Sequence, residues 1–193
     1  EGIISGRSIC PNCNTKLKII ELIPIFSSLI QKFKCRSCNK EISKRYIIIE
    51  FLTGLLFTII FMLSADTQTL IYLLIISIPL ALISIYDIEN QEIPIPFTVS
   101  VGILSLVGAF LNPVEPFLYL IIGGIIGYLF FYIQHLISRG KWVGLGDADL
   151  ALALGLQLGP AKTGLMIFIA YIIGSIVGIY LLVSKKADTK TQL

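Results

Sequence analysis

The stretch LIYLLIISIPLALISIYD at residues 70–87 decides the fold of this chain. It is almost entirely apolar up to Ile85, and it ends on an aspartate, Asp87. A second aspartate, Asp147, follows Gly144-Leu145-Gly146 and has apolar segments on both sides. An Asp at the centre of a membrane helix costs about 2.5–3.5 kcal/mol on insertion scales, so carboxylates in or beside such runs are candidates for a functional site.

The composition is that of a membrane protein. Of the 193 residues, 55% are hydrophobic and 14% are charged, whereas a soluble domain carries about 25% charged residues. A span needs about 20 residues, and the apolar segments that approach this length lie at residues 46–63, 70–86, 96–111, 117–138, 148–158 and 163–184. The third is marginal and the fifth is short. We therefore expect an all-α polytopic membrane protein with a helical bundle of about six spans.

The basic residues predict how the chain is oriented. They gather before the first apolar segment, at Arg7, Lys16, Lys18, Lys32, Lys34, Arg36, Lys40, Lys44 and Arg45. Cytoplasmic segments carry an excess of Lys and Arg, so residues 1–45 should be cytoplasmic. Six spans then leave Lys162 outside and put Arg139, Lys141 and the basic tail inside. With this count, Asp87 and Asp147 fall on the same cytoplasmic face.

A nucleic-acid surface is the weaker interpretation of the basic segment. Such a surface interleaves basic residues with stacking aromatics, and here only Phe26 and Phe33 are available. We therefore expect the bilayer as a partner and no nucleic acid.

The four cysteines predict a small metal-binding unit. Cys10 and Cys13 form one C-x-x-C knuckle, and Cys35 and Cys38 form another. Two such knuckles resemble a zinc ribbon, in which four thiolates close a tetrahedral shell with no position left for water. Two disulfides are the alternative, although a reducing cytosol disfavours them. We expect structural zinc in a segment at 1–45, followed by a membrane domain at 46–193.

A pair of carboxylates that share one proton is the chemistry of an aspartic protease. One member activates a water, while the protonated member polarises the scissile carbonyl. Gly144 and Gly146 would allow a close backbone approach beside Asp147. The structural alternative is that both aspartates cap helices, since Asp is a common capping residue. His135, in the segment 117–138, is interpreted as a hydrogen-bonding residue.

Further acidic residues surround the two aspartates in sequence. Glu89 and Glu92 follow Asp87, and Asp149 follows Asp147. They can attract a basic peptide or simply solvate the loops. Glu50 lies near the start of the first apolar segment, where a long side chain can reach back to the interface.

An ordered set of motifs makes the chain resemble the type IV prepilin peptidases, a family of Gly-x-Gly-Asp membrane aspartic peptidases. The set runs from the first cysteine knuckle through Ile23-Pro24, Ser27, the second knuckle, Arg45-Tyr46 and Glu50 to Asp87, Ile93-Pro94 and Gly144-x-Gly146-Asp147. The chain departs from the family pattern at Leu22, Ile47 and Asp149. The family carries a transmembrane helix before the cysteine segment, so we expect a further N-terminal piece in the natural protein.

The resemblance implies a bacterial inner-membrane endopeptidase. It would remove the basic leader from prepilins or pseudopilins at the cytoplasmic face, with Asp87 and Asp147 as the catalytic pair. Many members also N-methylate the new amino terminus from S-adenosylmethionine, and Glu50 would contact the substrate amine or support that site. Two other functions remain open. One is a related Gly-x-Gly-Asp protease that cuts within substrate helices. The other is a non-enzymatic binding or transport protein with a zinc-ribbon tail.

Overall fold

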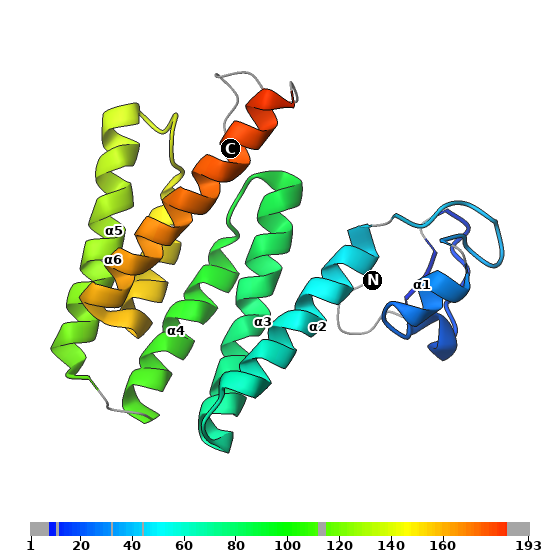
Figure 1. The fold of residues 1–193 in the computed structure, drawn as a ribbon, viewed down its shortest axis with the longest axis horizontal. Helices are drawn as coiled ribbons and strands as arrows, with labels where there is room; N and C mark the ends of the chain where they lie inside the picture. The colour runs from blue at the N-terminus through cyan, green and yellow to red at the C-terminus, as the bar shows by residue number, and fades with distance from the viewer. Residues whose placement is uncertain (1–7, 11, 32, 44, 112–114, 185–193) are drawn as a thin grey trace. The chain divides into compact units, whose positions relative to one another are not determined.

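The computed structural model describes residues 8–10, 12–31, 33–43, 45–111 and 115–184. Within these ranges the chain is helical, and its β contacts are the isolated bridges Ile9–Lys16 and Lys34–Glu41. The all-α prediction is therefore confirmed (Figure 1). Several basic residues used in the sequence predictions lie outside the described ranges: Arg7, Lys32, Lys44 and the tail residues Lys185, Lys186 and Lys190.

The chain divides into two compact units, Glu1–Leu70 and Ile71–Leu193. The first contains the 3-10 helix η1 (Ile19–Leu22), the short helix α1 (Phe26–Ile30) and the long helix α2 (Arg45–Leu63). The division that we expected after residue 45 concerns where the chain enters the membrane. The compact units do not test it, and it stays a prediction.

The remaining helices follow the apolar segments of the sequence. They are α3 (Thr67–Asn90), α4 (Ile95–Leu111), α5 (Phe117–Ser138) and α6 (Leu145–Val183). Among the described residues, α2, α3, α5 and α6 are long and apolar enough to cross a membrane, and α4 is shorter. Asp66 precedes α3 and accepts hydrogen bonds from the Thr69 backbone N–H (2.9 Å) and hydroxyl (2.7 Å). The Thr69 backbone N–H contributes most to lowering the pKa of Asp66.

Helix α6 folds back on itself at Gly159. This residue has φ 70° and ψ 170°, a conformation that glycine tolerates far better than other residues, and Pro160 follows it. A Cβ on Gly127 of α5 would lie 2.6 Å from the Ala151 carbonyl oxygen and 3.3 Å from the Thr163 methyl. Ala151 and Thr163 would be about 18 Å apart along a straight helix, so the two halves of α6 run in opposite directions (Figure 1).

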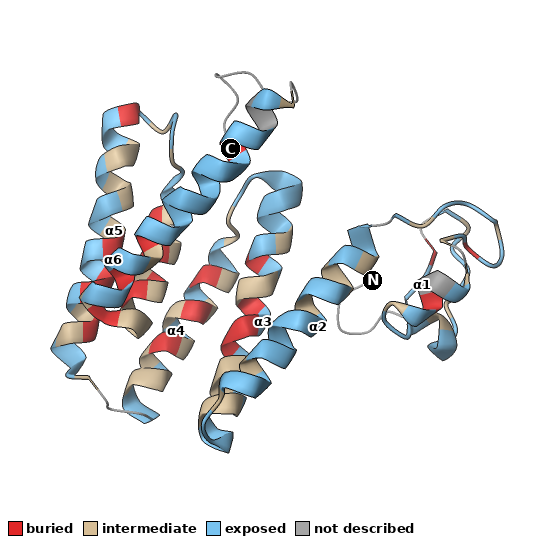
Figure 2. Cartoon of the chain, viewed as in Figure 1, coloured by how far each residue is buried: buried red, intermediate tan, exposed pale blue. Residues whose placement is uncertain are grey.

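Glycines allow α5 and the hairpin of α6 to pack backbone against backbone. A Cβ on Gly123 would lie 2.6 Å from the Gly155 carbonyl oxygen, and a Cβ on Gly155 would overlap the Gly123 carbonyl. At the fold-back itself, the buried Thr163 hydroxyl donates to the Gly159 carbonyl (2.7 Å). Small residues at such crossings are what membrane helices use to approach closely. Buried residues accordingly gather where α5 and α6 meet (Figure 2).

A second packed region joins α3, α4 and the first half of α6. Its buried side chains are Ile76 and Ile83 of α3, Val101 of α4 and Ala153 of α6. Ile93, in the connection between α3 and α4, packs against this cluster. The connection from α3 to α4 is therefore held against the start of α6.

We predict that Gly155→Leu lowers the free energy of unfolding in detergent by about 1–3 kcal/mol, because any side chain there overlaps the α5 backbone. Gly164→Leu is the matched control, since its Cβ meets no atom within 4 Å. Thermal unfolding of both purified variants tests this. Equal stability of the two variants would contradict the α5–α6 packing.

Candidate functional site

Asp87 lies in the last turn of α3 and is exposed. Its carbonyl accepts the Gln91 N–H (2.7 Å), and Gln91 has a left-handed φ of 56°, which ends the helix. The chain then turns through Ile93-Pro94 into α4, where the Pro94 carbonyl accepts the Phe97 and Thr98 N–H groups (3.1 and 3.3 Å). Asp87 is therefore separated from α4 by a short, well-bonded turn.

Asp147 occupies the third position of α6 and is half-buried. Its Oδ2 accepts the Gly144 backbone N–H (2.9 Å). A carboxylate at the third helical position that accepts a hydrogen bond from the N–H of the residue before the helix forms one half of a capping box. The helix-cap role that the sequence left open for Asp147 therefore applies to one of its two carboxylate oxygens.

The turn after Asp87 touches the turn before Asp147. A Cβ built on Gly146 would lie 2.8 Å from the Ile93 Cβ, a separation too short for two carbon atoms. The loop of α3–α4 therefore rests directly on the glycine that precedes Asp147. By contrast, a Cβ on Gly144 would meet nothing closer than Asp147 Oδ2 at 3.4 Å, so the close approach depends on Gly146.

The two aspartates interact electrostatically. Burial has the largest influence on the Asp147 carboxyl, the Gly144 N–H comes next, and the negative charge of Asp87 is a smaller contribution. When two carboxylates lie close together, double ionisation is disfavoured, and a shared proton relieves the repulsion.

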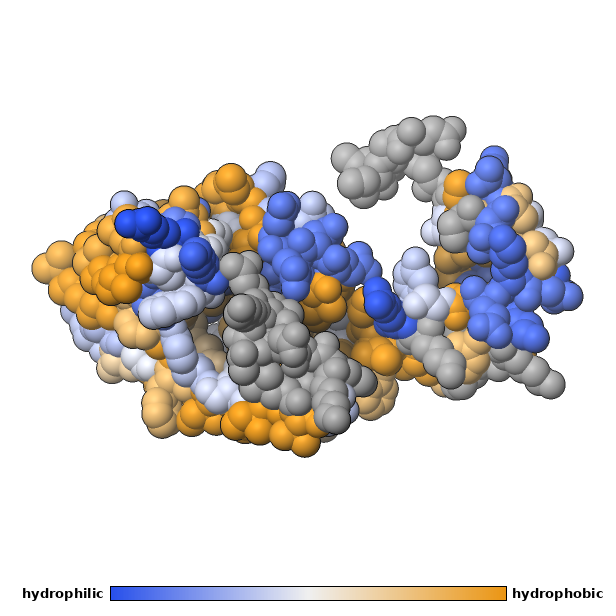
Figure 3. All heavy atoms as spheres, turned by 90° about the horizontal axis from the view of Figure 1, so that it is seen from above, coloured by the Kyte–Doolittle hydropathy of each residue, from blue (hydrophilic) through white to orange (hydrophobic). Residues whose placement is uncertain are grey.

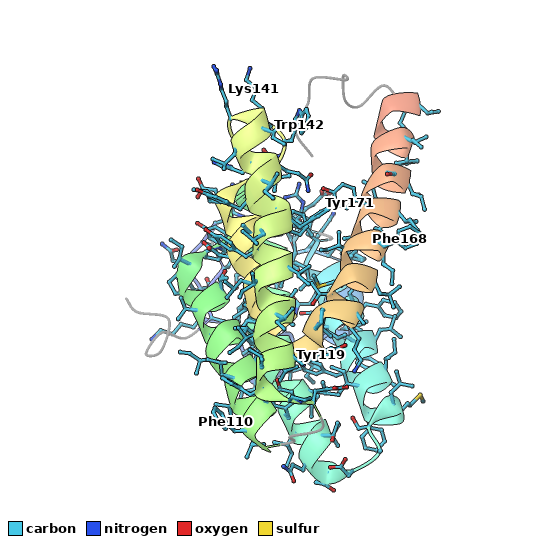
Figure 4. The ribbon with its side chains drawn as sticks, turned by 90° about the vertical axis from the view of Figure 1, so that its left-hand side faces the viewer. Phe110, Tyr119, Lys141, Trp142, Phe168 and Tyr171 are labelled. Atoms are coloured by element: carbon cyan, nitrogen blue, oxygen red, sulfur yellow. The ribbon has the colours of Figure 1, made fainter. Side chains whose placement is uncertain are left out.

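The loop between α5 and α6 holds the Asp147 turn in place. His135 Nδ1 lies 2.8 Å from the Val143 carbonyl, directly before Gly144. Arg139 (φ 53°) and Gly140 (φ 75°) end α5 in left-handed conformations. Lys141 and Trp142 lie at this same end of the helical unit (Figure 4). The interpretation of His135 as a hydrogen-bonding residue agrees with this contact.

The acidic residues that lie near Asp87 and Asp147 in the sequence are exposed, namely Glu89, Glu92 and Asp149. Seen from the end of the helical unit where α3 and α5 terminate, hydrophilic residues lie on the end and hydrophobic residues around the rim (Figure 3).

Glu50 belongs to the other unit. Its Oε2 accepts the Ile25 backbone N–H (2.7 Å), a partner that the sequence did not indicate.

The four cysteines form one cluster. All four are free thiols, and their sulfur atoms lie within 4.8 Å of one another. Cys10–Cys38 and Cys13–Cys35 are separated by 3.9 and 4.0 Å between sulfurs. Four sulfurs bound to one zinc at 2.3 Å would be about 3.8 Å apart. The cluster therefore fits a tetrahedral metal and does not contain the alternative disulfides.

The two knuckles share one local structure. In each, the first cysteine carbonyl accepts the N–H of an asparagine four residues later, Asn14 (2.9 Å) or Asn39 (2.8 Å). Both asparagines are left-handed, with φ 54° and 55°, a conformation that Asn adopts more readily than most residues. The knuckles therefore present their thiols in equivalent geometry.

Hydrogen bonds favour the thiolate form that binds metal at Cys13 and Cys35. The Thr15 hydroxyl lies 3.3 Å from Cys13 Sγ and lowers the pKa of Cys13 to about 6. Backbone N–H groups of Cys38 and Ser37 lower the pKa of Cys35. At Cys38 the Lys40 backbone N–H acts in the same direction, but burial and the neighbouring thiols outweigh it and raise the pKa of Cys38 to about 11.

Comparison with known proteins gives the family. The model of the type IV leader peptidase family matches residues 74–179, and the bacterial peptidase A24 N-terminal domain matches residues 1–64. The chain belongs to the type IV leader peptidase family. The predicted resemblance is therefore confirmed over both compact units. No solved structure matches the chain.

Curated relatives extend across nearly the whole chain. A type 4 prepilin-like proteins leader peptide-processing enzyme of Escherichia coli is 31% identical over 188 residues, which is 95% of this chain and 69% of the relative. The prepilin leader peptidase/N-methyltransferases of Dichelobacter nodosus and Neisseria gonorrhoeae are 32% and 30% identical, over 90% and 95% of this chain. The chain spans 62% and 65% of those two relatives.

Sequence reasoning missed two contacts of the candidate site residues. The Ile93–Gly146 contact joins residues 53 positions apart, and no pattern in the sequence pairs them. The bond from Ile25 to Glu50 had no sequence signal beyond a carboxylate inside an apolar segment.

We predict that Gly146→Ala destabilises the helical unit by about 1–3 kcal/mol, because its methyl group would overlap Ile93. Gly144→Ala should retain stability, since the nearest side-chain atom would be 3.4 Å away. Thermal unfolding of the two variants in the same detergent is the measurement. A Gly146→Ala variant as stable as Gly144→Ala would show that the two turns are not in contact.

Proposed function

We propose that the protein is an aspartic endopeptidase that removes the basic leader from type IV prepilins or pseudopilins. The observation that carries the proposal is the contact of Ile93 with Gly146, which brings the turns that bear Asp87 and Asp147 together. Membership of the type IV leader peptidase family supports it, as do the names of the relatives. The proposed catalytic residues are Asp87 and Asp147, with Gly144 and Gly146 as supporting residues.

In the proposed reaction, the charged carboxylate takes a proton from a water whose oxygen attacks the scissile carbonyl carbon. The protonated carboxyl gives its proton to the carbonyl oxygen. As the C–N bond breaks, the carboxyl that took the water proton passes it to the leaving amine, and the other carboxylate takes back its proton, so both return to their starting states. Asp147 has one oxygen fixed by the Gly144 N–H. This bond orients Asp147 and leaves its other oxygen for the water or the shared proton.

The charge distribution supports a cytoplasmic active site in the bacterial inner membrane. Arg139 and Lys141 follow α5 at the end of the helical unit that carries Asp147, whereas Lys162 follows the fold-back at the opposite end. The excess of basic residues at cytoplasmic ends favours this orientation. The exposed Glu89 and Glu92 would then meet the basic leader of the substrate.

The cysteine cluster is proposed to hold one structural zinc. Cys10, Cys13, Cys35 and Cys38 supply all four ligands, so no coordination position remains for catalysis. When bound, zinc would contribute folding energy to a unit with little apolar core. N-methylation from S-adenosylmethionine is a separate hypothesis that rests on the names of relatives. Transfer of label from methyl-labelled S-adenosylmethionine to the cleaved pilin tests it.

We expect Asp87→Asn and Asp147→Asn each to abolish prepilin cleavage in proteoliposomes. An amide can neither take a proton from water nor share one with its partner, so each loss should exceed about a hundredfold. Zinc content should be unchanged. Glu115→Gln, before the start of α5 at the other end, is the control for a neutralised acid. Cleavage by either Asn variant at the wild-type rate would reject the mechanism.

We expect the double substitution Glu89→Gln/Glu92→Gln to raise the apparent KM for prepilin at low salt and to leave kcat unchanged. Attraction between exposed charges is screened as salt rises, so the difference from wild type should shrink at high salt. A KM equal to that of wild type at low salt would mean that the acids only solvate their loop.

We expect Cys13→Ser and Cys38→Ser to reduce bound zinc from about one per chain to nearly none, because a structural site needs all four thiolates. Ser37→Ala, between two ligands, should keep its zinc. Elemental analysis of the purified proteins is the measurement. Full zinc occupancy in both serine variants would contradict a four-cysteine site.

A further inference from the structure

The N-terminal unit exposes an apolar surface on η1 and α1. Ile19, Ile20, Phe26 and Ile30 are 78, 71, 66 and 75% exposed. We call these four side chains the ribbon patch. Clustered exposed apolar residues on so small a unit mark a surface that another apolar phase covers.

A hydrogen bond fixes the depth of this patch relative to a membrane helix. The Ile25 backbone N–H donates to Glu50 Oε2 (2.7 Å), and Glu50 lies five residues after the start of α2 at Arg45. Those five residues correspond to about 7.5 Å along the helix. Ile25 therefore lies level with the second turn of α2.

Helix α2 has little length to spare. Its 19 residues extend about 28 Å, close to the roughly 30 Å of a bilayer's hydrocarbon core. The second turn of α2 must then lie at or below the boundary between head groups and acyl chains. The residue that Glu50 holds, Ile25, adjoins Phe26 of the ribbon patch.

Several backbone N–H groups of this segment are bonded, which lowers the cost of bringing it into a region of low polarity. Phe26 N–H donates to the Pro24 carbonyl (2.6 Å), and Ser27 N–H donates to Ile23 (3.1 Å). Lys18 N–H donates to Glu21 Oε2 (2.7 Å). Satisfied backbone groups are the condition for burial in lipid. The Ile25 bond also explains how a carboxylate is accommodated inside an apolar helix.

Basic residues flank the patch on both sides in sequence. Lys16 and Lys18 precede η1, Lys34 and Arg36 follow α1, and all four are exposed. A hollow of about 520 Å³ beside Cys35 is lined by two apolar, two basic and one acidic side chain, among other residues: Ile20, Ile30, Lys34, Arg36 and Glu21. Apolar and basic side chains around one hollow match the acyl chain and phosphate of an anionic phospholipid.

We infer that residues 18–31 form an interfacial anchor, in which the ribbon patch inserts into the leaflet where α2 begins. Lys18 and Lys34 lie at the level of the lipid phosphates. Glu50 acts as the tether that holds the anchor at this depth. The anchor keeps the cysteine cluster against the membrane surface, and it does not depend on the proposed protease activity.

Tryptophan fluorescence in vesicles tests the anchor. Trp142 is the one tryptophan of the chain, so Trp142→Phe provides a dark background for a new probe at Phe26→Trp. Glu41→Trp, also exposed in the N-terminal unit, is the matched control. Both proteins are reconstituted in full length into phosphatidylcholine–phosphatidylglycerol vesicles whose phosphatidylcholine is brominated in the upper acyl chain.

Bromine should quench Phe26→Trp by about half and the control by much less, while aqueous acrylamide should quench mainly the control. Adding Glu50→Ala should lower the bromine quenching of Phe26→Trp, and Glu50→Gln, which keeps an acceptor oxygen, should preserve it. Equal bromine quenching at positions 26 and 41 would overturn the anchor. Protection of Phe26→Trp from both quenchers would also overturn it, because protein would then cover the patch. Unchanged quenching with Glu50→Ala would overturn the assignment of Glu50 as the tether.

Discussion

The contact between Ile93 and Gly146 is the constraint on which the candidate site depends. It joins the turn after α3 to the turn before α6, and each turn carries one aspartate. Asp87 is an exposed residue at a helix end and Asp147 is part of a helix cap. The contact is what brings the turns that carry them together. Val101 of α4 and Ala153 of α6 belong to the buried cluster against which Ile93 packs, so the packing of these two helices helps to hold the contact. The fold thus serves to hold two loops against each other at one end of a helical bundle.

The low polarity of a membrane accounts for several hydrogen bonds of the described residues, although the Tyr72 and Ser105 hydroxyls are buried without a partner. Thr163 donates to Gly159 at the fold-back of α6, Asp147 accepts the N–H of Gly144, and Glu50 accepts that of Ile25. The bonds of Thr163 and Glu50 satisfy groups within apolar helices, where an unpaired polar group is costly, whereas Gly144 is exposed. Glu50 and Asp147, two carboxylates in or beside apolar segments, therefore have structural partners, and the partner of Asp147 leaves one oxygen for chemistry.

The sequence predicted the features that follow from local pattern. The segment 117–138 coincides with α5, and the two C-x-x-C knuckles form the expected cluster, because hydrophobic runs and cysteine spacing are local signals. The segments 148–158 and 163–184 were expected as separate helices, and they form the two halves of α6 on either side of Gly159. Contacts between distant residues, such as Ile93 with Gly146, leave no periodic signal, so only the three-dimensional structure reveals them.

A double-mutant cycle on prepilin cleavage tests most directly whether this contact creates the active site. Gly146→Ala should slow cleavage at least about tenfold, since small displacements of catalytic groups are costly. Ile93→Gly should also slow cleavage, because Ile93 packs against the buried cluster, but it removes the Cβ that the new methyl group would strike. The loss in the double variant should therefore be smaller than the product of the two single losses, which is the coupling expected of two residues in contact. Losses that simply multiply in the double variant would contradict the account.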